Sequence, residues 1–197
     1  PTPTETPTAV RVLNVGTTPD LSSYVRVGIA GANATSQNLN NSVSNDPSFA
    51  FDDLPNTSWQ EGVGGYGVGE ILRASFDGNY KVHYIAFRLG NWKSDRYFWV
   101  NPRPKTLTVK IGDFVGDVTF PDGQNMFYLE FNKDLPANAV EIVIKDVYTD
   151  SGRYGDRYQD TPISDILFYG VRDSSSQSSN ESQEEGGQIG QAGEPAW

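Results

Sequence analysis

Apolar residues recur at every second position through most of the chain between residues 21 and 172, the spacing that places side chains on one face of a β-strand. Turn-forming residues separate these runs, as at 77–79, 121–123 and 135–138. The pattern predicts about eight strands. Their ranges are 24–30, 70–76, 82–89, 106–111, 115–120, 126–131, 140–147 and 163–169.

No long stretch shows the roughly 3.6-residue spacing of an amphipathic helix, although residues 47–53 suit a single helical turn. Many short strands without helices between them favour an antiparallel sandwich or barrel over a parallel α/β sheet. Internal repeats, which would indicate a propeller or a solenoid, are not visible. We therefore expect an all-β fold, an antiparallel β-sandwich of the jelly-roll type.

The two ends of the chain differ in composition from its middle. Residues 1–8 alternate proline with threonine, a pattern that favours extended polyproline II. Residues 173–197 consist mainly of Ser, Gln, Glu and Gly, a composition typical of disorder. We therefore expect a Pro/Thr-rich linker at 1–20, one β-sandwich domain at 21–172 and an acidic, Ser/Glu/Gly-rich disordered tail at 173–197.

The net charge of −10 is concentrated near the carboxyl end, because residues 173–197 hold five acids and no base. The rest of the chain has no cluster of lysines and arginines, so we expect no nucleic acid as a partner and no binding to an anionic membrane surface. No window holds the about 20 apolar residues of a membrane span. The chain lacks a starting Met and a signal-peptide pattern, so we expect it to be a fragment or processed form of a larger multidomain surface protein.

Two residue types narrow the chemistry further. The chain has no cysteine and one histidine. A disulfide scaffold, a cysteine nucleophile, a Cys-ligated metal and a multi-histidine metal centre are therefore excluded.

Two motifs carry a resemblance to a known family. The segment Ala50-Phe51-Asp52-Asp53-Leu54-Pro55-Asn56-Thr57-Ser58-Trp59 resembles the Asn-Ala-x-Asp-Gly-Asp-x-x-Thr-x-Trp signature of discoidin, or coagulation-factor type C, domains. These domains belong to the galactose-binding-like superfamily. The segment Ile163-Ser164-Asp165-Ile166-Leu167-Phe168 is similar to the family's final-strand pattern Ile-Ser-Glu-Ile-x-Phe. The resemblance implies a galactose-binding-like jelly roll, with Trp59 in its core.

Further segments narrow the resemblance to a bacterial branch of that family. Residues 67–71, 101–105, 146–148 and 160–164 are similar to the glycan-binding domain first named from secreted streptococcal NAD-glycohydrolases. In those proteins it is an accessory domain, distinct from the catalytic one. The resemblance covers about 30–170, and it implies a non-catalytic, extracellular role.

The first motif also raises the question of calcium, which takes about 6–8 oxygen ligands. In related domains this loop holds a structural Ca²⁺, and the resemblance implies Asp52, Thr57 and Asp165 as ligands, with Asp53 as a further candidate. The sequence departs from the family pattern, because Asp53 replaces a Gly, Leu54 an Asp and Asp165 a Glu. The alternative is a Pro-Asn-Thr turn whose side chains cap local backbone groups.

Two loops have the composition of a sugar site, which needs aromatic faces for C–H groups and polar side chains for hydroxyls. Residues 91–103 hold four aromatics, an acid, three bases and two amides, and residues 148–158 are also rich in polar and aromatic side chains. The family topology brings both loops to one end of the sandwich. The predicted glycan-binding residues are Trp92, Lys93, Tyr97, Arg103, Asp150, Arg153 and Tyr154. The alternative is that the aromatics plug the sandwich while the charges form surface ion pairs.

These observations predict a non-catalytic carbohydrate-binding module of an extracellular or bacterial cell-surface protein, with a glycan or polysaccharide as its ligand. A protein-interaction or adhesion domain of the same fold is the main alternative. A glycosidase needs two carboxylates about 5–10 Å apart, for which Asp95 and Asp150 are the candidate pair. Membrane binding through Phe98 and Trp99 is disfavoured by the acidic chain.

Overall fold

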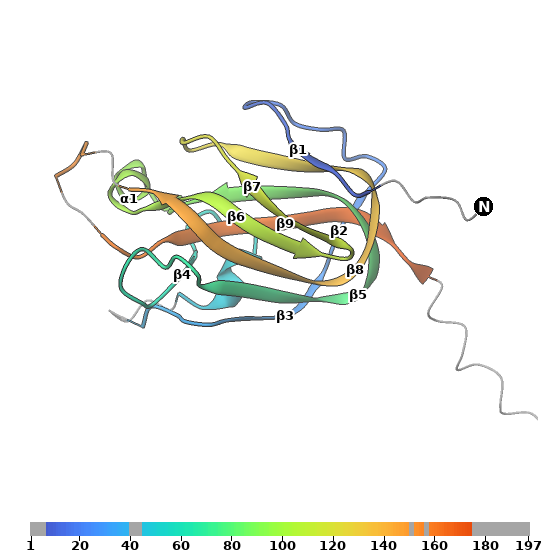
Figure 1. The fold of residues 1–197 in the computed structure, drawn as a ribbon, viewed down its shortest axis with the longest axis horizontal. Helices are drawn as coiled ribbons and strands as arrows, with labels where there is room; N and C mark the ends of the chain where they lie inside the picture. Colours follow the sequence, from blue (N-terminus) through green and yellow to red (C-terminus); the bar gives the residue numbers. More distant parts are fainter. Residues whose placement is uncertain (1–6, 40–44, 150–151, 156–157, 175–197) are drawn as a thin grey trace, which may run out of the picture.

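The computed structural model describes residues 7–39, 45–149, 152–155 and 158–174 of the chain (Figure 1). Within them lie nine strands, one 3-10 turn and one short α-helix. In chain order these are β1 (Val10–Val12), β2 (Val25–Arg26), β3 (Ile29–Ala34), η1 (Pro47–Ala50), β4 (Trp59–Gln60), β5 (Ile71–Leu89), α1 (Asp95–Val100), β6 (Arg103–Ile111), β7 (Phe114–Thr119), β8 (Met126–Tyr148) and β9 (Pro162–Arg172).

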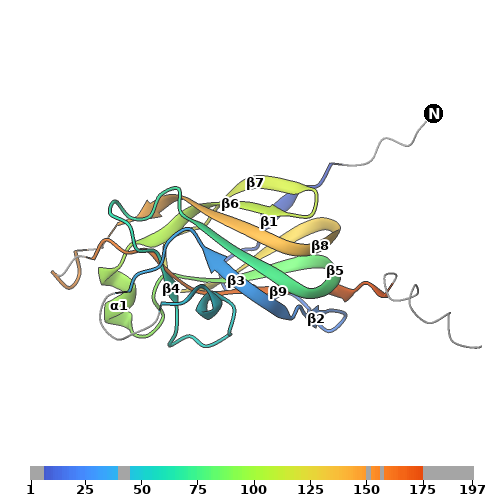
Figure 2. The same cartoon turned by 90° about the horizontal axis from the view of Figure 1, so that it is seen from below.

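The strands form an antiparallel sandwich in which β5 and β8 belong to both layers (Figures 1 and 2). Residues 71–75 of β5 pair with β3 and with residues 139–143 of β8, and β6 and β7 extend this layer. Residues 80–89 of β5 pair with β9 and with residues 126–137 of β8, and β1, β2 and β4 extend the other layer. The predicted all-β sandwich is confirmed.

The turns predicted at 77–79 and 135–138 are bends within continuous strands. The pairing register of β5 shifts between Ser75 and Tyr80, and the bend of β8 lies directly beside it, with Tyr80 opposite Ala137 and Val82 opposite Leu135. Residues 80–82 of β5 pair with residues 135–137 of β8, so the ladder resumes directly after the shift. For this reason four of the predicted strands become the halves of two long ones.

Most of the core lies between the two layers. It includes Leu72 and Leu107 from one layer and Phe87 and Phe168 from the other. Trp59 is fully buried there, as expected, and its indole nitrogen donates to the Ser36 carbonyl at 3.0 Å. Burying such large apolar side chains contributes roughly 1.5–3 kcal/mol each.

The amino-terminal segment shows that the linker assignment at 1–20 extended too far. Val10–Val12 forms β1, which pairs with residues 129–131 of β8. Leu13 and Leu21 pack on a second, smaller cluster on the outer face of the sandwich, made by Ala86, Tyr128 and Leu167. A strand of three residues is too short to show an alternating pattern. The neighbouring Pro/Thr composition therefore led to its assignment to the linker. The remainder of both predicted tails, residues 1–6 and 175–197, lies outside the described residues.

A second difference is α1, which lies within the loop predicted at 91–103. The side chain of Ser94 caps this helix by accepting a hydrogen bond from the Tyr97 amide, and Phe98 is buried beneath it. Six residues are too few to establish helical periodicity in the sequence. The helical turn expected near 47–53 is present as η1. No helix in the described part of the chain is long and apolar enough to cross a membrane.

Candidate functional site

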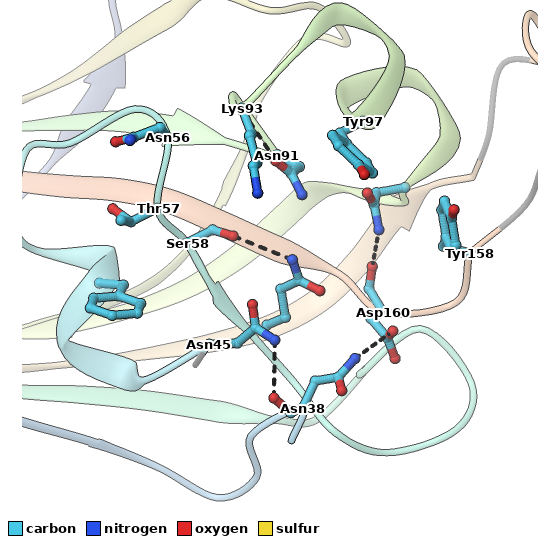
Figure 3. A pocket seen from close by; sticks show the side chains of 13 residues that line it. Asn38, Asn45, Asn56, Thr57, Ser58, Asn91, Lys93, Tyr97, Tyr158 and Asp160 are labelled. Atoms are coloured by element: carbon cyan, nitrogen blue, oxygen red, sulfur yellow. Dashed lines mark hydrogen bonds between the residues drawn. The ribbon is translucent and has the colours of Figure 1, made fainter. Parts of the chain in front are cut away.

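A pocket of about 590 Å³ opens at the end of the sandwich where α1 and β4 lie (Figure 3). Five separate segments of the chain contribute to it. Its lining consists of six carboxamides, two hydroxyls, three aromatic rings, one lysine and one aspartate. These residues are Asn38, Asn45, Phe49, Asn56, Thr57, Ser58, Gln60, Asn91, Lys93, Tyr97, Asn101, Tyr158 and Asp160.

Hydrogen bonds among the lining residues hold several carboxamides in place. The side-chain amides of Asn38 and Asn101 donate to the carboxylate and the backbone carbonyl of Asp160, at 2.7 and 3.2 Å. Asn45 donates to the Asn38 carbonyl at 3.0 Å, and Gln60 donates to the Ser58 hydroxyl at 3.4 Å (Figure 3). These hydrogen bonds join separate segments of the chain, whose amides together form one polar surface. Burial raises the pKa of Asp160.

Two tyrosines form an exposed aromatic wall of this pocket. Tyr97 comes from α1 and Tyr158 from the segment before β9, and their exposed fractions are 40% and 43%. The Tyr158 amide donates to the Val100 carbonyl at 3.1 Å, which joins the two segments. Figure 3 shows both rings on the same side of the pocket. The Lys93 ammonium lies 6.0 Å from the centre of the Tyr97 ring.

Two of the predicted glycan-binding residues, Lys93 and Tyr97, line the pocket. Trp92 does not. Its indole nitrogen donates to the Leu89 carbonyl at 3.0 Å, and the Arg88 guanidinium lies 5.9 Å from its ring centre. Trp92 therefore packs over β5 and its ring is only partly available to a ligand.

Arg103 is a structural residue and not an exposed ligand contact. It is only 3% exposed and forms a two-pronged pair with the Asp122 carboxylate, at 2.7 and 2.9 Å. Its remaining hydrogen bonds go to the backbone carbonyls of Asn101 and Thr149, at 2.9 and 2.8 Å. These donors are already occupied, which corrects the sequence prediction. The composition of a polar loop does not show whether an arginine in it is buried or exposed.

Arg153 and Tyr154 contact α1 through Asp95 and so lie apart from the pocket lining. The Tyr154 hydroxyl donates to the Asp95 carboxylate, and Arg153 lies 3.5 Å from it. The two loops meet at one end of the sandwich, as predicted, but these residues fasten the second loop to the helix. The hydrogen bond from Tyr154 lowers the pKa of Asp95, which opposes a role as a glycosidase acid. Asp150, the remaining predicted contact, lies outside the described residues.

Sequence reasoning missed most of the carboxamides and both Asp160 and Tyr158. Asn38, Asn45 and Asn56 come from stretches before and after η1, outside the two predicted loops. The two predicted loops combine aromatic with polar residues, whereas the signal for these asparagines is their density at 38–45 and at 56. That signal does not show which asparagines face one another.

A buried carboxylate supports the pocket from below. Glu61 has no exposed surface, and its two oxygens accept from the amides of Thr161 and Val63, at 2.9 and 2.8 Å. The Thr161 hydroxyl donates to the Tyr66 carbonyl at 2.7 Å. Glu61 thus ties the glycine-rich loop 62–69 to the chain that follows Asp160. Burial raises the pKa of Glu61.

Two of the four candidate calcium ligands contact an arginine, and the other two contact each other. Arg88 bridges Asp53 and Asp165 at 2.7 Å from each, while both oxygens of Asp52 accept from the Thr57 hydroxyl, at 3.0 and 2.9 Å. No group of three acidic or histidine side chains within the described residues could hold a metal ion. One oxygen of Asp165 is buried without a hydrogen-bond partner in that part of the chain, and burial raises the pKa of this carboxyl to about 6.

Comparisons with known proteins relate the fold of this chain to domains of known structure. A search of curated protein sequences finds no match. Among solved structures, the family 32 carbohydrate-binding module of Clostridium perfringens NanJ, in complex with galactose, aligns with a TM-score of 0.55 at 16% identity, over 74% of this chain and 99% of that one. The two such modules of C. perfringens ZmpB, in complex with GalNAc, align with a TM-score of 0.56 at 14% identity, over 85% of this chain and 40% of that one.

The family 32 module of AlyQ, in complex with 4,5-unsaturated mannuronic acid, gives a TM-score of 0.51 at 11% identity, over 73% of this chain and 97% of that one. At such identities these likenesses show the shared fold. The family model of the NAD glycohydrolase translocation F5/8 type C domain matches residues 23–169, a span that runs from just before β2 into β9. Since that match includes most of the sandwich and the whole pocket lining, the chain belongs to the NAD glycohydrolase translocation F5/8 type C domain family.

Proposed function

We propose that this domain is a non-catalytic carbohydrate-binding module that holds its glycan in the carboxamide-lined pocket. The observation that carries the proposal is the combination of two exposed tyrosine rings with six carboxamides in one pocket. Tyrosine faces pack against the C–H groups of a sugar ring, and carboxamides both donate to and accept from its hydroxyls. A volume of about 590 Å³ lies in the range of small-molecule sites, so it suits one or two sugar units.

The structural neighbours support this proposal without naming the ligand of this chain. The solved complexes of the NanJ, ZmpB and AlyQ modules contain galactose, GalNAc and an unsaturated mannuronic acid. The fold therefore serves sugars of different kinds in those proteins. The same comparison favours an accessory module of a larger extracellular or cell-surface protein, which is part of the proposal.

The acidic residues of the pocket lining favour binding over catalysis. A glycosidase needs two carboxyl groups on either side of the bond that breaks. Asp160 is the single carboxylate in the described lining, and it accepts a hydrogen bond from Asn38. This lining offers hydrogen bonds and ring faces, which are the means of binding.

Glycan-array screening of the purified domain, followed by calorimetric titration of the sugars that bind, tests the proposal. Tyr97→Ala and Tyr158→Ala should each weaken binding by about tenfold, because each removes a stacking face. Both rings are exposed, so these variants should keep the thermal midpoint of the wild type. Val115→Ala, at an exposed site on β7, serves as the control. Wild-type affinity in both folded tyrosine variants would refute this site.

A protein partner is the alternative outcome of the same experiment. A domain that binds no glycan on the array but binds a protein through the same tyrosines would be an adhesion or docking domain of this fold.

A further inference from the structure

Lys93 is one of two lysines without a carboxylate partner in the described part of this acidic chain. Four of the six lysines pair with a carboxylate: Lys105 with Asp146, Lys110 with Glu141, Lys133 with Asp113 and Lys145 with Asp117. Lys93 has no such partner within the described residues, and Lys81, which also has none, lies on β5 outside the pocket lining. The unpaired ammonium of Lys93 points into the pocket (Figure 3).

Two arginines near the pocket, Arg88 and Arg103, are paired with carboxylates and do not compete with Lys93 for an anion. Arg88 is engaged by Asp53 and Asp165, and Arg103 by Asp122. Lys93 is thus the only cation in the described lining.

The pocket is polarised along its length. In Figure 3 Asp160 lies below and to the right of Lys93, next to Asn38, and its carboxylate and the neighbouring carboxamides offer acceptors to hydroxyl groups. A sugar that presents hydroxyls to Asp160 therefore has its other edge near Lys93. A carboxylate on that edge would gain an ion pair and would stay away from the charge of Asp160.

We propose that the preferred ligand is a sugar that bears a carboxylate, bound with its acidic group at Lys93 and its hydroxyls toward Asp160. This inference rests on the proposed glycan-binding function and specifies its ligand class. A single lysine in an acidic protein suits one carboxylate, whereas a densely charged polyanion would need a cluster of basic residues.

The test is a calorimetric titration with matched sugars on the full chain. D-galacturonic acid should bind about threefold to tenfold more tightly than D-galactose, as expected for one partly exposed ion pair. This preference should shrink between about 50 mM and about 0.5 M NaCl, because salt screens exposed charges. N-acetylneuraminic acid is a second arm that distinguishes a uronic acid from a sialic acid.

Lys93→Met should bind D-galacturonic acid and D-galactose with about equal affinity, whereas Lys93→Arg should retain the preference. Equal binding of neutral and acidic sugars by the wild type would refute the inference while the proposed function stands. Preference for galactose 6-sulfate over galacturonic acid would refute the carboxylate assignment. Failure of all sugars to bind would refute the proposed function itself.

A second, independent observation concerns the turn where related domains hold calcium. Arg88 on β5 stands directly opposite Asp165 on β9 and reaches Asp53 in the turn. Arg26 on β2 adds two contacts, to the Asp53 carboxylate at 2.9 Å and to the Phe51 carbonyl at 3.0 Å. Two guanidinium groups therefore connect the turn to three strands.

The departures from the family motif fit this arrangement. Asp53 occupies a left-handed backbone conformation, with φ of 62°, at the position where the resemblance expects glycine. A side chain in that region costs free energy, of order 1 kcal/mol or more. Here the side chain provides the carboxylate that both arginines contact. The change from glycine to aspartate thus creates the acceptor for Arg88.

We infer that Arg88, together with Asp53, replaces the structural cation of related domains, so that the fold of this chain is independent of calcium. The guanidinium joins the turn to the final strand. The calcium ligands that the resemblance implies, Asp52, Thr57 and Asp165, lie on the same two segments. Arg88 is 18% exposed at its side chain and Asp165 is fully buried, so little solvent screens the pair.

Thermal unfolding of the full chain tests this inference. The midpoint should be the same, within about 1 °C, in excess EDTA and in about 1 mM CaCl₂, whereas a bound structural ion would raise it. Arg88→Met should lower the midpoint by about 5–10 °C, since it leaves a buried carboxylate unpaired. Arg73→Met is the control, because it breaks a partly exposed pair with Glu141, which keeps its second partner Lys110, and it should change the midpoint little.

Elemental analysis of dialysed protein provides a readout that does not require any variant to fold. About one calcium per chain, or a midpoint that rises with calcium, would overturn the inference. So would an Arg88→Met protein that is as stable as the Arg73→Met control.

Discussion

At the scale of single residues, buried carboxyl groups near the pocket make the stability of this domain depend on pH. Glu61 is the clearest case, since its carboxylate is fully buried and accepts two backbone amides. Burial disfavours the charged form, and the pKa of Glu61 is raised as a result, even though both amide hydrogen bonds lower it. The folded state therefore holds the Glu61 proton to a higher pH than the unfolded state does.

This shift predicts how stability depends on pH. An acid whose pKa is raised on folding contributes stability that is complete below the unfolded pKa and is lost as pH rises through the folded pKa. Glu61→Gln removes that titration. The gap between wild type and Glu61→Gln in the free energy of unfolding should therefore be largest at acidic pH and should narrow as pH rises. Urea denaturation across a pH series measures this gap.

Glu130→Gln provides a control of the opposite sign. The hydrogen bond from Arg11 lowers the pKa of Glu130, so its contribution is present above the unfolded pKa and is lost as pH falls. The gap for Glu130→Gln should widen as pH rises. If the gaps of both variants changed in the same direction, the assignment of Glu61 would be wrong.

At the scale of elements, short segments have effects that their length does not suggest. The helix α1 has six residues, yet its cap at Ser94 and its buried Phe98 set the direction of Tyr97 into the pocket. The strand β1 has three residues, yet it completes one edge of a layer and brings Leu13 over the outer cluster of Ala86 and Tyr128. Each element is stabilised by what it packs against.

Removing β1 tests this dependence. A chain that begins at Val15 loses the pairing with β8 and the apolar contacts of Leu13, so its thermal midpoint should fall by several degrees. A chain that begins at Pro7 keeps every contact described above and should melt with the full chain. Differential scanning calorimetry of the three chains measures both effects. An unchanged midpoint after removal to Val15 would show that β1 adds no stability.

At the scale of the whole molecule, the pocket residues and the acidic carboxyl-terminal segment lie in different parts of the sequence. Every lining residue of the pocket lies between Asn38 and Asp160, whereas four glutamates lie in the segment 175–197. These glutamates add to the net negative charge of the chain, and salt screens interactions between exposed charges over about 10 Å at 0.1 M ionic strength.

A chain that ends at residue 174 should therefore bind neutral sugars with the affinity of the full chain. It should bind carboxylate sugars slightly more tightly at low ionic strength, and this difference should vanish in about 0.5 M NaCl. Calorimetric titrations at two salt concentrations measure the effect. A loss of neutral-sugar binding in the shortened chain would contradict the assignment of the site to residues 38–160.

Much of the fold was predictable from local pattern. Alternating residues such as Ile85 and Phe87 face the core, and seven of the eight predicted runs lie almost entirely in strands. The run predicted at 24–30 instead spans β2, a break at 27–28 and the start of β3. The segments 50–59 and 163–168 were enough to indicate the family. Lys93 and Tyr97 were found because an aromatic-rich loop is visible in the sequence. These are features that neighbours in the chain determine.

The rest depended on which distant segments meet. Arg103 and Arg153 belong to loops of similar composition, yet one is buried against Asp122 and the other lies beside Asp95. Asn38 became a pocket residue because the chain before β9 brings Asp160 to it, across 122 positions of sequence. The sequence by itself thus determined the strands, the family and the aromatic loop, since each rests on short-range periodicity or motif. Tertiary structure alone decided which polar groups face each other, because burial and hydrogen bonding depend on contacts between residues far apart in the chain.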